Sequence, residues 1–192
     1  MKAKENVIIY ADAQRCLGCH SCELACAVAH GGGVSLVDAV MQNLHLHPRT
    51  KVVVADDVMM PMQCRQCENA PCALVCPTGA CRQVDGQVQI NESNCVGCKL
   101  CVMVCPFGAI TVRSDQTKDF YSVTNQGVAQ KCDLCSDWRE ENGKTTTACA
   151  EACPTKAISL IDMHLYREAL IKARAKELAQ SHKNMSLTMR GL

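Results

Sequence analysis

Residues 95 to 106 read CVGCKLCVMVCP, and this stretch decides how the chain folds. Its thiols lie two residues apart at Cys95, Cys98 and Cys101, the next follows three residues later at Cys105, and a proline comes after it. Three thiolates at this spacing can curl around one face of an iron–sulfur cubane, while the fourth points away along the start of a helix. The stretch therefore predicts a ligand run for [4Fe–4S] clusters.

The same kind of run occurs four times along the chain. The second run lengthens the middle gap to four residues and the fourth run lengthens it to thirteen, but all four close with the same three-residue step. Runs two, three and four end in Cys-Pro, where proline lacks an N–H, fixes φ and can open the next segment. The four runs are Cys16, Cys19, Cys22 and Cys26; Cys64, Cys67, Cys72 and Cys76; Cys95, Cys98, Cys101 and Cys105; and Cys132, Cys135, Cys149 and Cys153.

Zinc and disulfide bonds are the alternative uses of so many cysteines. Structural zinc sites pair two CxxC dipeptides across a longer loop and need no third thiol two residues further on. Disulfide frameworks suit exported domains, whereas the start of this chain lacks the long apolar stretch, the cleavage site and the twin arginines of export signals. Iron is favoured, and a zinc-binding structural or interaction module is the remote alternative.

Composition and charge limit the partners and the location. The formal charge is +1, but sixteen thiolates around four doubly positive cluster cores would bring the oxidised protein to about −7. With no basic patch carrying interleaved aromatics, nucleic acid is not expected as a partner. No uncharged apolar run approaches the roughly 18 to 20 residues that span a bilayer. We expect a cytoplasmic protein without direct membrane insertion.

The segment between runs two and three predicts how the runs pair. Residues 80–84 and 87–90 are predicted to form two strands, joined by Asp85-Gly86, a favoured two-residue hairpin turn. This hairpin leads directly into run three. Runs two and three should therefore form one inner module (58–114). Runs one and four then form an outer module (1–57 and 115–162), which includes an insertion at 31–57. The expected fold class is α+β, with two pseudo-symmetric ferredoxin-like modules, one inserted in the other, and a C-terminal helix and tail at 163–192.

The fourth thiol of each run points away from the first three. We therefore expect it to bind the cluster that the first three thiols of the paired run hold, as in bacterial two-cluster ferredoxins. This arrangement is called crosswise ligation here. The four predicted clusters are named here by their first run cysteine. They are the Cys16 cluster (Cys16, Cys19, Cys22, Cys153), the Cys132 cluster (Cys132, Cys135, Cys149, Cys26), the Cys64 cluster (Cys64, Cys67, Cys72, Cys105) and the Cys95 cluster (Cys95, Cys98, Cys101, Cys76).

Several other residues have a plain structural interpretation. Cys81 aligns with Ile110 and Ile158 in the repeats, which favours a buried small hydrophobe beside a cluster. His20 lies inside run one and could replace or hydrogen-bond a ligand, but that run already has its thiols. The other five histidines lack partners at ligand spacing and are expected on the surface or behind the ligands. The methionines at 59, 60 and 62 are expected in the core. The helix that begins after Asp162 is expected to pack its apolar face on the modules, with docking on a partner as the alternative.

The runs, with Cys-Glu-Leu-Ala-Cys26, Gln63-Cys-Arg-Gln-Cys67, Cys-Pro-Thr-Gly-Ala80 and Lys131-Cys-Asp-Leu-Cys135, resemble the four-cluster ferredoxin subunits of dimethyl sulfoxide reductase, formate dehydrogenase and formate hydrogenlyase. The resemblance covers roughly residues 5 to 162. It implies the same crosswise ligand scheme and an electron wire without catalytic residues.

Within that group, the short chain and the opening Cys-Leu-Gly-Cys-His-Ser-Cys-Glu-Leu-Ala-Cys-Ala-Val-Ala-His30 are most similar to the iron–sulfur proteins that accompany anaerobic carbon monoxide dehydrogenase. That resemblance implies electron flow from carbon monoxide dehydrogenase to a hydrogenase or another acceptor. A subunit of a formate dehydrogenase, formate hydrogenlyase or molybdenum reductase complex is the alternative.

Overall fold

A computed structural model describes residues 7–113 and 127–189 of the chain. The strands are β1 (Val7–Ala11), β2 (Lys51–Ala55), β3 (Val58–Met62), β4 (Cys81–Val84), β5 (Gln87–Ile90), β6 (Thr111–Arg113), β7 (Val128–Gln130) and β8 (Ile158–Asp162). The helices are α1 (Ser21–Ala29), α2 (Leu36–Met41), α3 (Pro71–Leu74), α4 (Leu100–Val104), α5 (Ser136–Glu141), α6 (Ala148–Glu151) and α7 (Met163–Met189), with a 3₁₀ turn at Glu92–Asn94. The expected mixture of helices and small sheets is confirmed.

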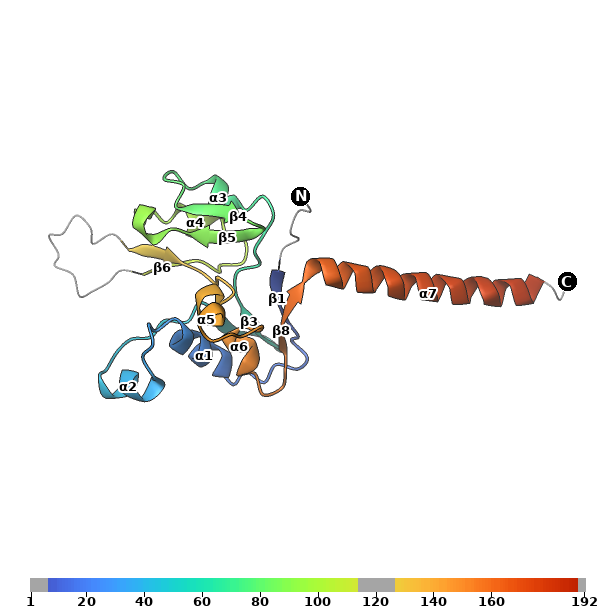
Figure 1. The fold of residues 1–192 in the computed structure, drawn as a ribbon, viewed down its shortest axis with the longest axis horizontal. Helices are drawn as coiled ribbons and strands as arrows, with labels where there is room; N and C mark the ends of the chain where they lie inside the picture. Colours follow the sequence, from blue (N-terminus) through green and yellow to red (C-terminus); the bar gives the residue numbers. More distant parts are fainter. Residues whose placement is uncertain (1–6, 114–126, 190–192) are drawn as a thin grey trace.

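Strands from the two ends of the chain pair with each other. β1 lies antiparallel to β8, with Val7 opposite Asp162 and Ala11 opposite Ile158. Ile9, in the middle of β1, is 1% exposed because its side chain enters the core below this ribbon. Helices α1 and α6, which follow thiols of runs one and four, also pack together. Figure 1 shows these four elements gathered in one half of the body.

The hairpin between runs two and three is confirmed. β4 and β5 pair over their full length, from Cys81 opposite Ile90 to Val84 opposite Gln87. Asp85 and Gly86 have φ angles of 50° and 77°, as a two-residue turn with both central residues left-handed requires. The hairpin lies beside α3 and α4, which pack on each other (Figure 1).

A further ribbon links the segments on either side of the inner region. β6, which follows run three, pairs with β7, which precedes run four, and Val112 lies opposite Ala129. These strands belong to different predicted modules, so backbone hydrogen bonds join the two. The predicted boundary at 114/115 lies outside the described residues.

A hairpin pairs β2, at the end of the insertion, with β3, at the start of the predicted inner module. Its buried residues are Val52 and Pro61, which lie opposite each other. The expectation that the three neighbouring methionines lie in the core is wrong: Met59 is 37% exposed, and Met60 and Met62 are only partly buried. Met59 and Pro61 do share one side of the alternation along β3, but only Pro61 reaches the core.

Cysteines supply much of the interior, since the chain has few aromatic residues. One apolar cluster surrounds Ile9 and Leu134 and includes thiols from runs one, two and four. The other surrounds Val88 and Ile110 and includes thiols from runs two and three, together with Cys81. Each core thus forms around the groups of thiols.

Helix α7 begins where predicted but does not pack as predicted. The Asp162 carboxylate accepts the backbone N–H groups of His164 and Leu165 at 2.9 and 3.3 Å, which caps the helix. The helix is about 40 Å long and extends away from the body (Figure 1). Its large apolar side chains, such as Leu165 and Leu178 at 63%, are exposed. The expectation that α7 packs on the modules is wrong, because charged residues interrupt its apolar positions and leave no continuous stripe.

Within the described ranges, no helix is both long and apolar enough to cross a membrane.

Candidate iron–sulfur sites

Each cysteine run contains the same backbone bend. The residue directly before the second cysteine is left-handed in all four runs, with φ between 51° and 64° at Gly18, Gln66, Gly97 and Leu134. This conformation costs a non-glycine residue roughly 1–2 kcal/mol, so Gln66 and Leu134 keep it against their own preference. The bend is what a short loop needs if its thiols are to face a common centre.

A second bend follows the fourth cysteine of runs two, three and four. The third residue after it, Gly79, Gly108 or Lys156, has φ between 54° and 64°. In runs two and four the returning backbone aims an N–H at the ligand sulfur: Cys81 N at Cys76 Sγ (3.4 Å) and Ala157 N at Cys153 Sγ (3.3 Å). Such bonds favour a thiolate over a neutral thiol.

Hydroxyl groups also approach the sulfurs, but not equally in each run. Thr78 and Thr155, each two residues after the fourth cysteine, lie 3.7 and 3.6 Å from Cys76 Sγ and Cys153 Sγ. In run three the same position is Phe107, which has no hydroxyl. Hydrogen bonds to ligand sulfur are one of the factors that set cluster potentials, so the four sites are not electronically equivalent.

Thiols of runs one and four lie close enough to influence one another. Burial raises the pKa of Cys26 to about 12, and the charges of Cys135 and Cys149, both from run four, add to this rise. Burial raises the pKa of Cys22 to about 11, again with a contribution from Cys149. At the surface, the Ser21 hydroxyl lowers the pKa of Cys19, while the charge of Cys153 opposes it. Cys26 and Cys153 therefore each lie near thiols of the other run.

Runs two and three show the same exchange. Burial raises the pKa of Cys67, and the nearby Cys72 and Cys105 contribute, the latter from run three. Conversely, Cys76 of run two lines a small pocket together with all three leading thiols of run three, Cys95, Cys98 and Cys101. Cys105 therefore lies near a thiol of run two, and Cys76 lies beside the leading thiols of run three.

Cys81 is buried, at 3% exposure, as expected from the repeats. A hydrogen bond from its thiol lowers the pKa of Cys72 to about 6, and the same bond raises the pKa of Cys81. Cys81 thus packs in the apolar core, as the repeats predicted, with its sulfur beside the predicted ligand Cys72. No disulfide joins any two of the seventeen cysteines, and only Cys19 and Cys98 are exposed.

Unpaired donors in the interior fit an electron-rich inorganic cofactor. Gln63 is 1% exposed, and its Nε2 has no acceptor among the described residues. A buried amide donor without an acceptor costs about 1–3 kcal/mol, and the sulfides of a cluster would supply acceptors. Backbone N–H groups also point at thiols outside the terminal bends, from Arg49 to Cys26 (3.2 Å) and from Ala129 to Cys95 (3.4 Å). The thiol set and these donors fit [4Fe–4S] clusters.

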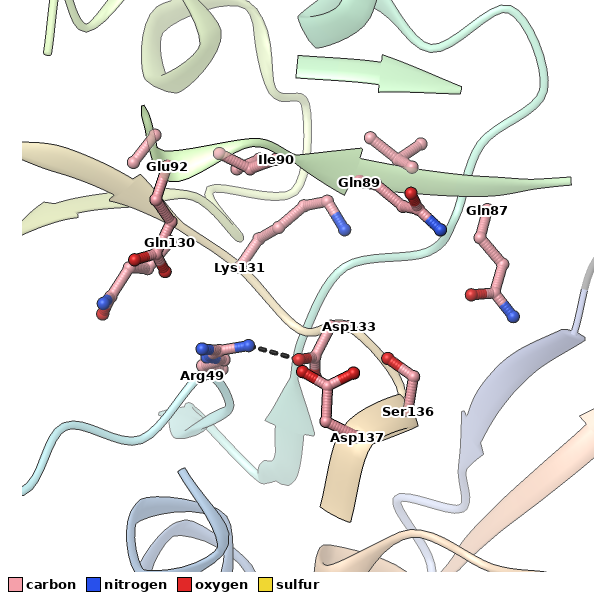
Figure 2. Close-up of a pocket in the computed structure, with 12 residues that line it drawn as sticks. Arg49, Gln87, Gln89, Ile90, Glu92, Gln130, Lys131, Asp133, Ser136 and Asp137 are labelled. Carbon is pink, nitrogen blue, oxygen red and sulfur yellow. Dashed lines mark hydrogen bonds and ion pairs between the residues drawn. The ribbon is translucent and has the colours of Figure 1, made fainter. Parts of the chain in front are cut away.

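A polar triad beside run four was missed by the sequence reasoning. His30 lies behind the ligands, which is one of the two expected places, and its Nε2 is 3.0 Å from Asp133 Oδ1. Arg49 forms an ion pair with the other carboxylate oxygen (Figure 2). Burial alone would raise the pKa of Asp133, but His30 and Arg49 together hold it at about 2. The signal available in the sequence was Asp133 itself, an acid between two predicted ligands.

This triad reaches the ligands directly. Its Arg49 carries the backbone N–H that bonds to Cys26 Sγ, and its Asp133 accepts the N–H of Cys135 at 3.0 Å. His20, by contrast, lies at the surface beside Glu23, with 3.0 Å between the ring Nδ1 and the carboxylate. Figure 2 shows Arg49 and Asp133 at the edge of a polar pocket of about 380 Å³ between β5 and the segment that leads into α5.

Comparison with known proteins agrees with this chemistry. The chain is 65% identical over 182 residues to an iron–sulfur protein of Rhodospirillum rubrum, covering 95% of this chain and 96% of the relative. It is 38% identical to formate hydrogenlyase subunit 2 of Escherichia coli, covering 82% of each chain. It is 35% identical to the electron transport protein HydN of Escherichia coli, covering 89% of this chain and 97% of the relative.

The profile of one protein family matches more than half of the chain. This profile, the 4Fe-4S dicluster domain, covers residues 55–163, which include runs two, three and four. Together with the named relatives, the match identifies an iron–sulfur protein of electron transfer that binds [4Fe–4S] clusters. The chain belongs to the 4Fe-4S dicluster domain family.

Proposed function

We propose that the protein carries four [4Fe–4S] clusters on the sixteen run cysteines, in the crosswise sets named above, within an inner and an outer ferredoxin-like module. The observation that carries the proposal is the exchange of fourth cysteines: Cys26 lies near the thiols of run four, and Cys76 lines a pocket with those of run three. The β1–β8 ribbon and the α1–α6 packing support an outer module built from the two ends of the chain.

The exposure of the thiols supports an order of the proposed clusters along the electron-transfer path. Cys19 and Cys98, the two exposed cysteines, belong to the Cys16 and Cys95 clusters. In the interior, Cys64 and Cys132 share one apolar core. We infer a chain in which the Cys132 and Cys64 clusters are the middle pair and the Cys16 and Cys95 clusters are the terminals. Each cluster supplies one-electron exchange, and the protein supplies burial, sulfur hydrogen bonds and partner surfaces.

We propose carbon monoxide dehydrogenase as the electron donor and a hydrogenase or another redox enzyme as the acceptor, in the cytoplasm. The support is the resemblance carried by the run-one opening. A subunit role in a formate-oxidising or molybdenum reductase complex is the second candidate. The 38% identity to formate hydrogenlyase subunit 2 favours it specifically.

Metal analysis after anaerobic purification tests the cofactor. We expect about sixteen irons and a similar number of acid-labile sulfides per chain, with a broad visible absorption that bleaches on reduction. Stoichiometric zinc without sulfide would instead assign the thiols to a zinc-binding module.

A reduction assay tests the donor. The oxidised protein is mixed anaerobically with substoichiometric carbon monoxide dehydrogenase and then with CO. Rapid bleaching that depends on both enzyme and CO is the expected result. Clusters that stay oxidised under CO but bleach with formate and a formate dehydrogenase would select the second candidate.

A further inference from the structure

Lys131 is the single charged side chain that is fully buried among the described residues, at 4% exposure. The other buried polar side chains, Thr50, Gln63, Gln66 and Thr147, are neutral. The Lys131 ammonium donates to the backbone carbonyl of Cys132 at 2.9 Å. No carboxylate of the described residues forms an ion pair with it. Within the part of the chain that the structure describes, its charge therefore has no carboxylate counter-ion.

The side chain lies between run two and run four. It precedes Cys132 in sequence, and the Cys132 carbonyl to which its ammonium donates also accepts the side-chain amide of Gln66, from run two, at 2.9 Å. Burial raises the pKa of Cys64 in run two, and the charge of Lys131 opposes that rise. The charge also favours the thiolate of Cys72, after the larger effect of Cys81. Figure 2 shows Lys131 directed toward β5, with Asp133 and Asp137 at the other side of the pocket.

A lone buried ammonium is costly, since the penalty for removing one ion from water is several kcal/mol. Nearby negative charge offsets it. An oxidised [4Fe–4S] cluster with four thiolate ligands carries a charge of about −2, so the Cys64 and Cys132 clusters would surround the ammonium with anions. Adding an electron makes a cluster more negative, and a fixed cation favours that reduced state.

We propose that Lys131 is a positioning residue of electron transfer, whose fixed charge raises the midpoint potential of the Cys64 cluster and, more weakly, of the Cys132 cluster. In each transfer one electron leaves one cluster and enters the next, and Lys131 keeps its proton. By making the middle pair easier to reduce, Lys131 promotes passage of the electron between the modules. This inference rests on the proposed set of four clusters.

The repeats supply a neutral replacement that fits. The residue before run two is Gln63, which is buried like Lys131 but uncharged. Lys131→Gln therefore places at run four a side chain that the equivalent position already accommodates, and it keeps an N–H donor. Lys131→Arg keeps the charge and alters the shape. Lys176→Gln removes the same charge from the exposed surface of α7 and is the matched control.

The experiment is an anaerobic redox titration of the cluster-loaded variants, followed by electron paramagnetic resonance, after iron and sulfide counts. We expect Lys131→Gln to retain its iron and to lower at least one midpoint, so that the reduced-to-oxidised ratio of that cluster at a fixed potential falls about tenfold, or 59 mV for one electron. Lys131→Arg should stay within about threefold of the native ratio, and Lys176→Gln should match the native protein.

A Lys131→Gln protein with full iron content and four unshifted midpoints overturns the inference. If Lys131→Gln loses iron, Lys131→Arg decides whether the charge or the packing of the side chain matters. Retained iron and native midpoints in Lys131→Arg support a role for the charge. Loss of iron in both variants shows a packing role and overturns the inference. An iron count in the native protein that excludes four clusters would reject the proposed function before any variant is compared.

Discussion

The side-chain amide of Gln66 donates a 2.9 Å hydrogen bond to the backbone carbonyl of Cys132, and its Oε1 accepts the N–H of Val88 at 2.9 Å. One buried amide thus connects run two with run four and with β5. The Cys132 carbonyl also accepts the Lys131 ammonium, so two donors hold this peptide. The relationship links the two predicted modules through one buried side chain, in addition to the β6–β7 ribbon.

Replacing Gln66 by Leu should loosen this connection. The change leaves the Val88 N–H unpaired and removes one of two donors from the Cys132 carbonyl. A buried unpaired group costs about 1–3 kcal/mol, which corresponds to roughly 2–4 °C in melting temperature per kcal/mol for a chain of this size. Anaerobic thermal unfolding of the holoprotein measures the shift. Gln89→Leu, at an exposed position on β5, is the control and should change the melting temperature little.

Gly97→Ala should damage the Cys95 cluster far more than Gly18→Ala damages the Cys16 cluster. Both glycines precede the second cysteine of their runs and have nearly the same φ, 63° and 64°. A Cβ on Gly97 would lie 2.2 Å from the backbone oxygen of Gly127, whereas one on Gly18 would meet the end of the Met59 side chain at 2.9 Å. The Met59 side chain can move aside, whereas the backbone of Gly127 cannot. Both variants therefore have the same backbone strain, but only Gly97→Ala has a clash that cannot be relieved.

Iron content and melting temperature of the two glycine variants check this prediction. Gly97→Ala should lose about four of sixteen irons, and Gly18→Ala should keep nearly all. Equal losses would mean that the left-handed backbone, and not the contact with Gly127, is the dominant constraint.

Cys153→Ala should disrupt the Cys16 cluster and spare the inner pair. The reason is that Cys153 lies near Cys19 of run one, and its own sulfur receives the Ala157 N–H. Mössbauer or electron paramagnetic resonance spectra, together with iron counts, should show one damaged cluster and intact Cys64 and Cys95 clusters. Full occupancy of the Cys16 site combined with loss of an inner cluster would contradict the crosswise pairing.

Removing residues 169–192 should leave the clusters and the stability unchanged. The segment begins after the first turn of α7, so the Asp162 cap is retained, and the apolar side chains of the described part of this segment are exposed, including Leu170, Ile171 and Leu178. We expect native iron content and a melting temperature within about 2 °C. Removal of residues 158–192 is the contrasting variant, since it also deletes β8 and leaves β1 without its partner. A large loss of stability in the shorter truncation would show that α7 contributes to the fold.

The sequence by itself determined the features that depend on local spacing. Thiol intervals predicted the ligand runs, Asp85-Gly86 predicted the β4–β5 hairpin, and Asp162 predicted the start of α7, because cluster geometry, turn chemistry and helix capping each act over a few residues. The repeats also predicted that Cys81 is buried, since isoleucine occupies its place elsewhere.

Only the tertiary structure decided the features that depend on distant segments. The His30–Asp133–Arg49 triad joins residues about 20 to 100 positions apart, and nothing in their separate surroundings indicates that they meet. The burial of Lys131 depends on run two, on β5 and on the thiols around it. The direction of α7 was misjudged because charged side chains interrupt its apolar positions, so the helix presents no continuous apolar stripe for the body to bury.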